Sequence, residues 1–351
     1  MQLPNSKPCL ENKYFGLKMS GRELQFQPLK FIDLFAGIGG FHYGLHDLGL
    51  QCVFASELDR KARETYEHNF KQISPQLFTG ETQPLFNQDI TQQDFNLIPD
   101  HDVLCGGFPC QPFSIAGYRK GLKDQGRGDL FFTILEIIRR KKPAVIFLEN
   151  VKNLLSHDQG KTYNYMKTLI SEEGYYVTEK VLNTMTYGNL PQNRERLYIL
   201  GFKSKIAYSH FAFPQPVPLT TEFRSMLENK EIDDYFYYNN KPLYERLKKE
   251  VVKTNTVYQW RRVYVRENKR GVCPTLTANM GTGGHNVPII KDEKGIRKLT
   301  PLECLRLQGF PKEFTFPETL SRGNQYKQVG NAVSVSVVKS IAQQIKLQCI
   351  N

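Results

Sequence analysis

The stretch Phe31-Ile32-Asp33-Leu34-Phe35-Ala36-Gly37-Ile38-Gly39-Gly40 is an apolar run that ends in a glycine-rich turn. A run of this kind predicts a buried strand, and a helical pattern follows from about Phe41. The next apolar run, Gln51–Ser56, ends at Glu57, twenty residues beyond Gly37. Such a strand–turn–helix–strand unit is typical of nucleotide and nucleoside sites, where glycines allow close backbone approach and a carboxylate binds ribose hydroxyls.

The glycines do not complete the dinucleotide fingerprint GxGxxG, because His42 stands at the third glycine position. This disfavours a NAD-dependent oxidoreductase, and a nucleoside cofactor without a pyrophosphate, such as S-adenosylmethionine, fits better. We expect Asp89 at the end of the third strand, near the adenine. By itself the glycine turn is as consistent with a tight structural turn. Together with Glu57 and Asp89 at successive strand ends, it favours a cofactor site.

The chain before residue 203 alternates between strand and helix patterns. The helical pattern is clearest at Leu130–Lys141, and the sequence Thr300-Pro301-Leu302-Glu303 predicts a helix start with a capping box. A further helical pattern covers Val333–Ile345. Alternation of this kind predicts an α/β fold with a mostly parallel sheet. The other expected strands are residues 29–35, 103–104 with their flanks, 144–148, 178–182 and 197–202.

Composition and charge narrow the class of protein. The 351 residues carry a net charge of +12 with 40% hydrophobic residues, which excludes a disordered or collagen-like chain. We expect neither a signal peptide nor a membrane span. The seven cysteines are scattered without a CxxC pair, which argues against a disulfide framework or metal site and for a reducing, cytoplasmic location.

The positive charge is concentrated in residues 201–298, which hold 18 Lys and Arg against 10 Asp and Glu. The segment also has a Pro-rich start and the aromatic cluster Tyr235-Phe236-Tyr237-Tyr238. We interpret it as a separate small domain with little regular helix, suited to an acidic partner such as nucleic acid. A solvated basic face on an ordinary domain is the alternative.

Reactive side chains follow several strands of the predicted sheet. Cys110 comes after Gly106-Gly107-Phe108-Pro109, Glu149 ends another strand, and Arg194 and Arg196 lie in a third connection. Each has an ordinary structural explanation, respectively a packing cysteine, a helix cap and a surface ion pair. Their joint occurrence at strand ends predicts one shared crevice.

A thiol and a carboxylic acid together suit methylation at C5 of cytosine. C5 is a poor nucleophile until a thiolate adds to C6, which makes C5 enamine-like. A protonated Glu149 donating toward N3 would stabilise that adduct. Methylation of an exocyclic amine needs no nucleophile, so Cys110 distinguishes the two reactions.

These motifs resemble those of the bacterial DNA (cytosine-5)-methyltransferases from about Lys30 to the C-terminus. Their order and spacing agree with the family's. The matching segments are Phe35-Ala36-Gly37-x-Gly39-Gly40, Pro109-Cys110-Gln111, Glu149-Asn150-Val151, Gln192-x-Arg194-x-Arg196, Arg297-Lys298-Leu299-Thr300-Pro301-Leu302-Glu303-Cys304, Gln308-Gly309-Phe310-Pro311 and Gly330-Asn331-Ala332-Val333.

The resemblance implies a Rossmann-like S-adenosylmethionine-dependent methyltransferase fold with an irregular target-recognition domain. It implies a catalytic domain of residues 29–203 and 299–351, a recognition domain of residues 204–298 and an N-terminal extension of residues 1–28. Cys110 would be the nucleophile and Glu149 the N3 proton donor, with Arg194 and Arg196 in the catalytic pocket. The cofactor-binding residues would be Phe35, Ala36, Gly37, Gly39, Gly40, Glu57, Leu58, Asp89, Ile90, Pro109 and Asn331.

The expected partner is double-stranded DNA. The glycine-rich, basic loop 113–128 is expected to close over it, although a plain surface loop has the same composition. Arginine reads guanine bidentately, and we expect sequence recognition from the basic segment. The expected DNA-binding residues are Gln111, Ser114, Arg119, Lys120, Arg127, Arg261, Arg262, Arg266, Thr282, Gly283 and Gly284.

Residues 271–288 resemble enzymes that act on GGNCC or GGWCC sites. A monomer is expected, with a cognate restriction endonuclease acting on the same site. The rival hypotheses are a tRNA cytosine-5 methyltransferase, whose Cys-Phe-Thr signature the chain lacks, and a catalytically silent DNA-binding protein, in which Cys110 or Glu149 would be lost.

Overall fold

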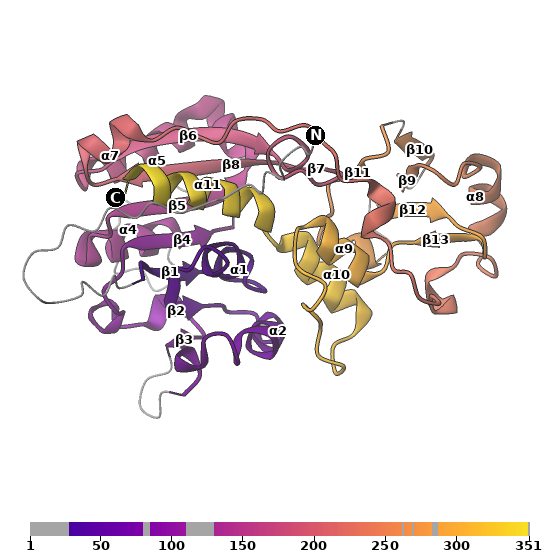
Figure 1. Ribbon diagram of the computed structural model, residues 1–351, viewed down its shortest axis with the longest axis horizontal. Coiled ribbons are helices and arrows are strands. Elements are labelled where there is room, and N and C mark those ends of the chain that lie inside the picture. The colour runs from indigo at the N-terminus through magenta and orange to yellow at the C-terminus, as the bar shows by residue number, and fades with distance from the viewer. Residues whose placement is uncertain are drawn as a thin grey trace, which may run out of the picture.

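In a computed structural model, the strands of the larger sheet lie in the order β3-β2-β1-β4-β5-β8-β6 (Figure 1). The structure describes residues 28–79, 85–109, 130–261, 263–268, 270–282 and 287–349. Pairing is parallel from β3 through β5, whereas β8 runs antiparallel between β5 and β6. This confirms the predicted α/β fold. The strands are β1 (Lys30–Leu34), β2 (Gln51–Ser56), β3 (Phe86–Asn87), β4 (Val103–Gly107), β5 (Val145–Val151), β6 (Tyr176–Asn183) and β8 (Glu195–Phe202).

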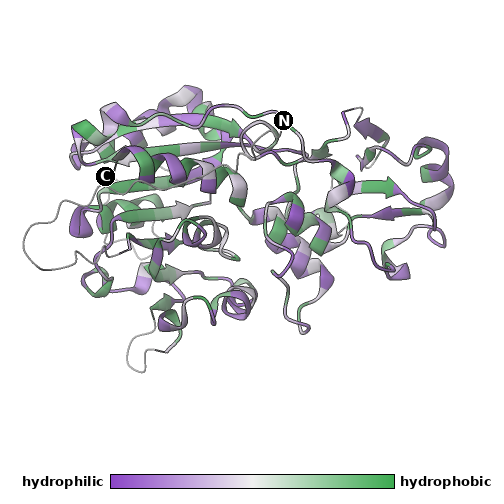
Figure 2. Cartoon of the chain, in the orientation of Figure 1, coloured by the Kyte–Doolittle hydropathy of each residue, from purple (hydrophilic) through white to green (hydrophobic). Residues whose placement is uncertain are grey.

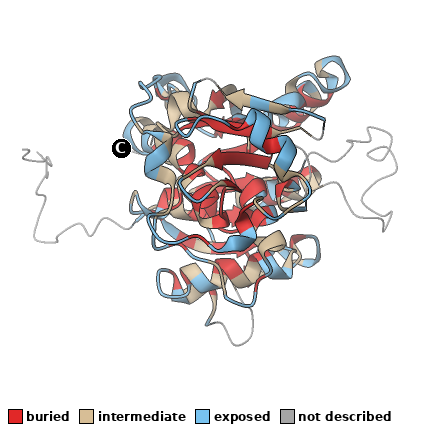
Figure 3. Ribbon diagram, turned by 90° about the vertical axis from the view of Figure 1, so that its right-hand side faces the viewer, coloured by how far each residue is buried: buried red, intermediate tan, exposed pale blue. Residues whose placement is uncertain are grey.

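Helices cover both faces of this sheet. Because side chains alternate along a strand, Phe31 and Phe147 pack into one core with residues of α1 and α11, whereas Ile32 and Ile146 pack into a second core with residues of α4 and α5. Burial on both sides explains why the strands are continuous apolar runs (Figures 2 and 3). These helices and their neighbours are α1 (Gly40–His46), α2 (Arg60–Phe70), α4 (Leu130–Lys141), α5 (Lys161–Glu172), α6 (Thr184–Tyr187), α7 (Lys205–His210) and α11 (Val335–Cys349).

A second, four-stranded antiparallel sheet lies in the basic segment, in the order β10-β9-β12-β13. The helix α8 (Tyr244–Glu250) accompanies it, and the connection to the larger sheet includes the short parallel pair of β7 and β11. Two helices, α9 (Pro301–Leu307) and α10 (Arg322–Asn331), follow in the chain. The strands are β7 (Gln192–Asn193), β9 (Val257–Trp260), β10 (Val265–Asn268), β11 (Cys273–Pro274), β12 (Val287–Lys291) and β13 (Ile296–Lys298).

Helix α10 joins the two halves of the molecule, between the larger sheet and the small one in Figure 1. It packs against the short helical turn η8 (Met280–Thr282) and against α9. On its other side, Gln328 accepts a hydrogen bond from Thr65 Oγ1 at 2.8 Å and donates to the carbonyl oxygen of Lys61 at 2.9 Å, both on α2. Helix α10 therefore connects the basic segment with α2, the helix that follows β2 of the larger sheet.

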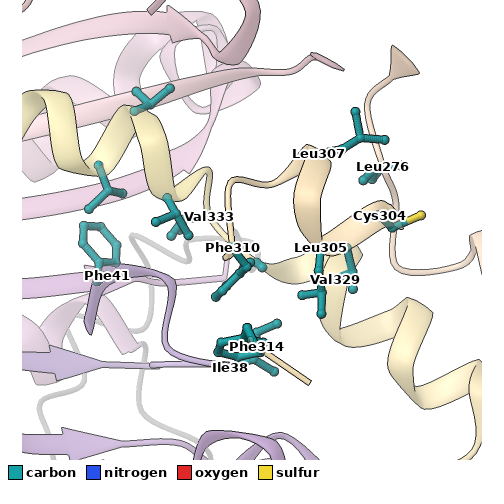
Figure 4. Close-up of a cluster of buried hydrophobic side chains, with 14 of the residues drawn as sticks. Ile38, Phe41, Leu276, Cys304, Leu305, Leu307, Phe310, Phe314, Val329 and Val333 are labelled. Carbon is teal, nitrogen blue, oxygen red and sulfur yellow. The ribbon is translucent and has the colours of Figure 1, made fainter. Parts of the chain in front are cut away.

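An apolar cluster fills the space between α10, α9, α1 and the chain that follows β11 (Figure 4). Figure 4 shows Leu276, Leu305, Val329 and Val333 in one continuous cluster with Phe41 of α1. These residues come from four separate segments, so the junction is a packed core and holds the elements in fixed relative positions.

The capping box predicted at the start of α9 is confirmed. Thr300 Oγ1 accepts the Glu303 N–H at 3.2 Å, and the Glu303 carboxylate accepts the Thr300 N–H at 2.8 Å. The predicted helices at 130–141 and in the C-terminal segment are also confirmed. In contrast, α10 was not predicted, because it is polar and contains Gly323 and Gly330.

Among the residues described, no helix combines the length and apolar character needed to cross a bilayer. Cys52, Cys105, Cys273 and Cys304 are free and buried.

Candidate active site

The glycine turn after β1 is built around backbone that only glycine tolerates easily. Gly37 and Gly39 have φ of 57° and 86°, and Phe35 also has a positive φ of 56°. A Cβ on Gly39 would lie 2.2 Å from Phe70 Cε2, so this glycine is required for packing on α2. A Cβ on Gly37 would meet nothing within 4 Å. The turn therefore presents an open backbone surface at Gly37.

Glu57, at the end of β2, is tied to this turn. Its carboxylate accepts the Gly37 N–H at 2.8 Å and the Asp59 N–H at 2.7 Å. Burial raises the pKa of Glu57, and the two backbone hydrogen bonds oppose that rise. A carboxylate has about four acceptor positions, so Glu57 can still accept hydroxyl groups. It combines a fixed orientation with spare acceptors.

Most of the other expected cofactor residues follow the strands β1 to β4, and Asn331 ends α10. Leu58 follows Glu57 with 71% of its surface exposed, which leaves an apolar side chain open to solvent next to Glu57 in the chain. Asp89 accepts hydrogen bonds from the N–H and hydroxyl of Thr91 through one oxygen, at 3.0 and 2.7 Å. The remaining positions include buried Ala36 and Ile90, the tightly packed Gly40, and exposed Pro109 and Asn331.

A buried polar cluster supports the turn from behind, and the sequence did not reveal it. Asp33 is fully buried, and its Oδ2 accepts the His42 N–H at 3.2 Å. The His42 ring bonds Tyr66 Oη at 2.5 Å and Ser74 Oγ at 3.1 Å. Burial raises the pKa of Asp33 to about 8. His42 therefore occupies the third glycine position of the dinucleotide fingerprint as a bonded core residue.

Glu149 and Arg196 meet at the ends of β5 and β8. Arg196 Nε lies 3.1 Å from Glu149 Oε1, and the two side chains are only 17% and 10% exposed, respectively. Burial raises the pKa of Glu149, while the charges of Arg196 and Arg194 lower it. The arrangement is a carboxyl group whose protonated form is favoured by desolvation, held next to a fixed cation.

Asn150 connects this pair to the end of β4. Its Nδ2 donates to the carbonyl oxygen of Phe108 at 3.0 Å, and its Oδ1 accepts the Val151 N–H at 2.8 Å. Asn150 was quoted only as part of a motif, yet it fixes the chain just before Pro109.

Arg194 is buried, and the structure places its guanidinium on main-chain carbonyl groups. It donates to Leu276 at 3.0 Å, Gly330 at 3.2 Å and Ala332 at 2.8 Å. Burial lowers its pKa to about 9, so it stays charged at neutral pH. The guanidinium therefore joins two other segments of the chain, at residue 276 and at residues 330–332, to its own.

The expected DNA-binding residues that the structure describes lie on two segments. Arg261 follows β9 and Arg266 lies in β10, and Thr282 ends η8, where its Oγ1 donates to the carbonyl oxygen of Asn279 at 3.0 Å. The other candidates lie outside the described residues: Cys110, Gln111, Ser114, Arg119, Lys120, Arg127, Arg262, Gly283 and Gly284.

Comparison with solved structures supports the fold. A mutant of Spodoptera frugiperda DNMT2 superposes with a TM-score of 0.69 at 21% identity, covering 91% of this chain and 99% of that one. The S. pombe Dnmt2 methyltransferase gives a TM-score of 0.67 at 20% identity, over 91% and 99% of the two chains.

Comparison with known sequences identifies the family. The chain is 48% identical to the type II methyltransferase M.Bsp6I of Bacillus sp. (strain RFL6), over 90% of this chain and 98% of the relative. It is 39% identical to the type II methyltransferase M.HhaI of Haemophilus parahaemolyticus, over 92% and 96%. The family model for C-5 cytosine-specific DNA methylases matches residues 29–347. The chain therefore belongs to the C-5 cytosine-specific DNA methylases and is a DNA cytosine-5 methyltransferase.

Proposed function

We propose that the enzyme methylates C5 of a cytosine flipped out of a short, specific double-stranded DNA sequence, through a covalent bond between Cys110 and C6. The observation that carries this proposal is the buried Glu149–Arg196 pair, which holds a carboxyl group of raised pKa at the carboxyl edge of the sheet. Cys110 follows β4, the strand next to β5, in the sequence.

The residues at the glycine turn fit S-adenosylmethionine. Gly37 leaves space where a larger residue would project, Glu57 has acceptors for ribose hydroxyls, and Leu58 offers an exposed apolar surface for adenine. Asp89 and Asn331 would complete the site, with Phe35 and Pro109 at its edges. When bound, S-adenosylmethionine supplies the methyl group.

In the proposed mechanism the Cys110 thiolate adds to C6 while Glu149 donates a proton toward N3, so the ring electrons move to C5. Arg196 holds the Glu149 carboxyl in place through its 3.1 Å contact. After C5 is methylated, a base removes the C5 proton, the C6–S bond breaks to return the thiolate, and the proton at N3 goes back to Glu149. Acid catalysis of this type contributes roughly 10²–10⁴-fold.

The target base must leave the duplex, because C6 is inaccessible in the stack. Base flipping costs about a few kcal/mol, which contacts to the DNA must offset. We propose that residues 204–298 form the recognition domain, since residues 201–298 carry most of the net positive charge. Residues 29–203 and 299–351 would form the catalytic domain, with α10 bonded to α2 and packed on η8.

The names of the relatives support a role in restriction and modification. M.Bsp6I and M.HhaI are both type II methyltransferases. We therefore propose a monomeric cytoplasmic enzyme that protects host DNA from a restriction endonuclease acting on the same site.

Bisulfite sequencing of DNA from cells that express the chain tests the proposal. We expect one short sequence to be methylated at a fixed cytosine, and no methylation with Cys110→Ser. Purified enzyme that methylates tRNA and leaves duplex DNA unmodified would instead support the RNA-directed alternative. Sequence-specific binding without methylation would support a silent regulator.

A further inference from the structure

Three buried side chains meet between the connection from β7 to β8, the end of α10 and the segment that follows β11. Gln192, Arg194 and Gln308 are 0%, 2% and 0% exposed. Gln192 lies in β7, Arg194 lies between β7 and β8, and Gln308 is the C-cap residue of α9. Each of them bonds main-chain groups of segments far away in the sequence.

The recognition side of this cluster is residues 275–278. The Leu276 carbonyl accepts from Arg194 at 3.0 Å, and the Leu276 N–H donates to Gln192 Oε1 at 3.3 Å. Leu276 is thus held at both its main-chain polar groups, and the chain continues from it into η8 and Thr282. The arrangement fixes the start of the segment that we assign to DNA recognition.

The cofactor side is residues 329–332. Arg194 donates to the carbonyls of Gly330 and Ala332, which flank Asn331, and Gln308 Nε2 donates to the carbonyls of Val329 at 2.8 Å and Ala332 at 3.2 Å. Gln192 Nε2 donates to Gln308 Oε1 at 3.1 Å and so completes the cluster. The main chain on either side of Asn331 cannot shift without breaking several buried hydrogen bonds.

The two sides are in direct contact. A Cβ on Gly330 would lie 2.3 Å from Ala278 N and 2.3 Å from the Thr277 carbonyl carbon, so only glycine permits this approach of α10 to the recognition segment. Arg194 spans the same contact with one rigid guanidinium. A displacement of either segment is therefore transmitted to the other through backbone atoms.

We propose that Gln192, Arg194 and Gln308 act as one positioning unit. The unit holds residues 329–332, around Asn331, and residues 275–282 in fixed positions relative to Glu149 and Arg196. Arg194 then serves the reaction through the main-chain segments that it holds, because both of its terminal nitrogens bond their carbonyls. This inference rests on the proposed function, since it assigns Asn331 to the cofactor and η8 to DNA.

Two substitutions test the unit. Arg194→Lys keeps a charge near Glu149 but replaces the planar fork with one ammonium group, and Gln308→Met keeps the volume but removes both Nε2 donors. Tyr175→Phe is the matched control, because it removes a buried hydroxyl that donates to the Pro143 carbonyl at 2.7 Å, apart from the three-residue cluster.

The measurements are the Kd for S-adenosylmethionine by calorimetry and the ratio of methylation rates on the target site and a site with one base changed. Both are taken well below each variant's Tm. For Arg194→Lys and Gln308→Met we expect the Kd to rise about tenfold, as for the loss of one buried hydrogen bond, and the ratio to fall similarly. Tyr175→Phe should lower Tm and leave both values unchanged.

The double variant gives a further check. Both side chains donate to the Ala332 carbonyl, so the combined increase in Kd should be smaller than the product of the two single increases. A wild-type protein that does not methylate DNA would refute the proposed function. An active wild type whose variants lose Tm but keep both values within twofold would overturn the positioning unit, and so would a change in only one of the two values.

Discussion

Arg196 Nε and Glu149 Oε1 lie 3.1 Å apart in a setting that is almost closed to solvent. Burial raises the pKa of Glu149 and the arginine lowers it, so the cation limits how far the carboxyl departs from its ordinary value. The pKa of Glu149 therefore reflects a balance between desolvation, which raises it, and the charge of Arg196, which lowers it. A change in either contribution should shift this pKa.

Removing the cation should shift the pH dependence of the reaction. In Arg196→Met the ionised form of Glu149 loses the positive charge that stabilises it, so the pKa of Glu149 rises. The limb of the pH profile on which the rate falls with increasing pH should therefore move to higher pH. Single-turnover rates between pH 5 and 9 measure this limb. Arg196→Lys, which keeps a charge, is the control and should show a smaller displacement. A limb that stays in place in Arg196→Met would mean that another group titrates.

Removing the acid should slow the chemistry and leave binding intact. Glu149→Gln keeps the shape of the side chain, so the single-turnover rate should fall roughly 10²–10⁴-fold while the Kd for DNA changes little. A near-normal rate would exclude the role of Glu149 as proton donor.

Two glycines of the same turn should behave differently. Gly39→Ala adds a strained φ and a Cβ 2.2 Å from Phe70, so it should destabilise the fold by several kcal/mol, on the order of other overpacked cores. Gly37→Ala adds strain of about 1–2 kcal/mol only, yet places its methyl group in the open space assigned to the cofactor. Urea unfolding and calorimetric Kd values separate the effects. Equal losses of stability would contradict the packing difference.

The buried Asp33 should make stability depend on pH. Its pKa is about 8 in the folded chain against an ordinary 3.8, so the folded state holds a proton that the unfolded state releases. Its contribution is complete below pH 3.8 and is lost as the pH rises through about 8. Asp33→Asn should therefore flatten the decline in unfolding free energy between pH 5 and 8. Asp100→Asn, whose side chain is 99% exposed, is the control and should match the wild-type slope. Parallel slopes for Asp33→Asn and wild type would be inconsistent with a buried, protonated Asp33.

DNA affinity should fall steeply with salt, because the basic segment releases counterions from phosphates. If Arg261 reads a base, Arg261→Gln should relax the preference at one position of the site. A uniform loss with a shallower salt dependence would identify it as a phosphate contact. Arg139→Gln, on α4 and paired with Glu136 and Glu173, is the control and should leave both properties unchanged.

Local patterns predicted much of the fold. The apolar run before Gly37 predicted β1, and Thr300 with Glu303 predicted the capped start of α9, because strands and helix caps are determined by neighbours in sequence. Helix α10 could not be predicted from the sequence, because it has hardly any amphipathic pattern. Its stability comes from tertiary contacts, such as the hydrogen bond that Gln328 of α10 accepts from Thr65 of α2.

The candidate site was predictable where chemistry is visible in residue type. Glu149, Arg196 and Glu57 stood out as charged residues at strand ends, and the structure describes each of them there. The hydrogen bonds of Gln308 and the burial of Asp33 depend on residues distant in sequence, so no local pattern could reveal them. The role of Cys110 remains a proposal from the motif, because it lies outside the described residues.

The covalent bond between Cys110 and cytosine C6 can be trapped chemically. A target cytosine with fluorine at C5 lacks the proton that must be removed before the C6–S bond breaks. We therefore expect the enzyme, with S-adenosylmethionine and DNA carrying this base at the site found by bisulfite sequencing, to form a complex that survives denaturing electrophoresis. The complex should be absent with Cys110→Ser and should map to a peptide containing Cys110. No stable complex with the active enzyme, or an equal yield with Cys110→Ser, would contradict the mechanism.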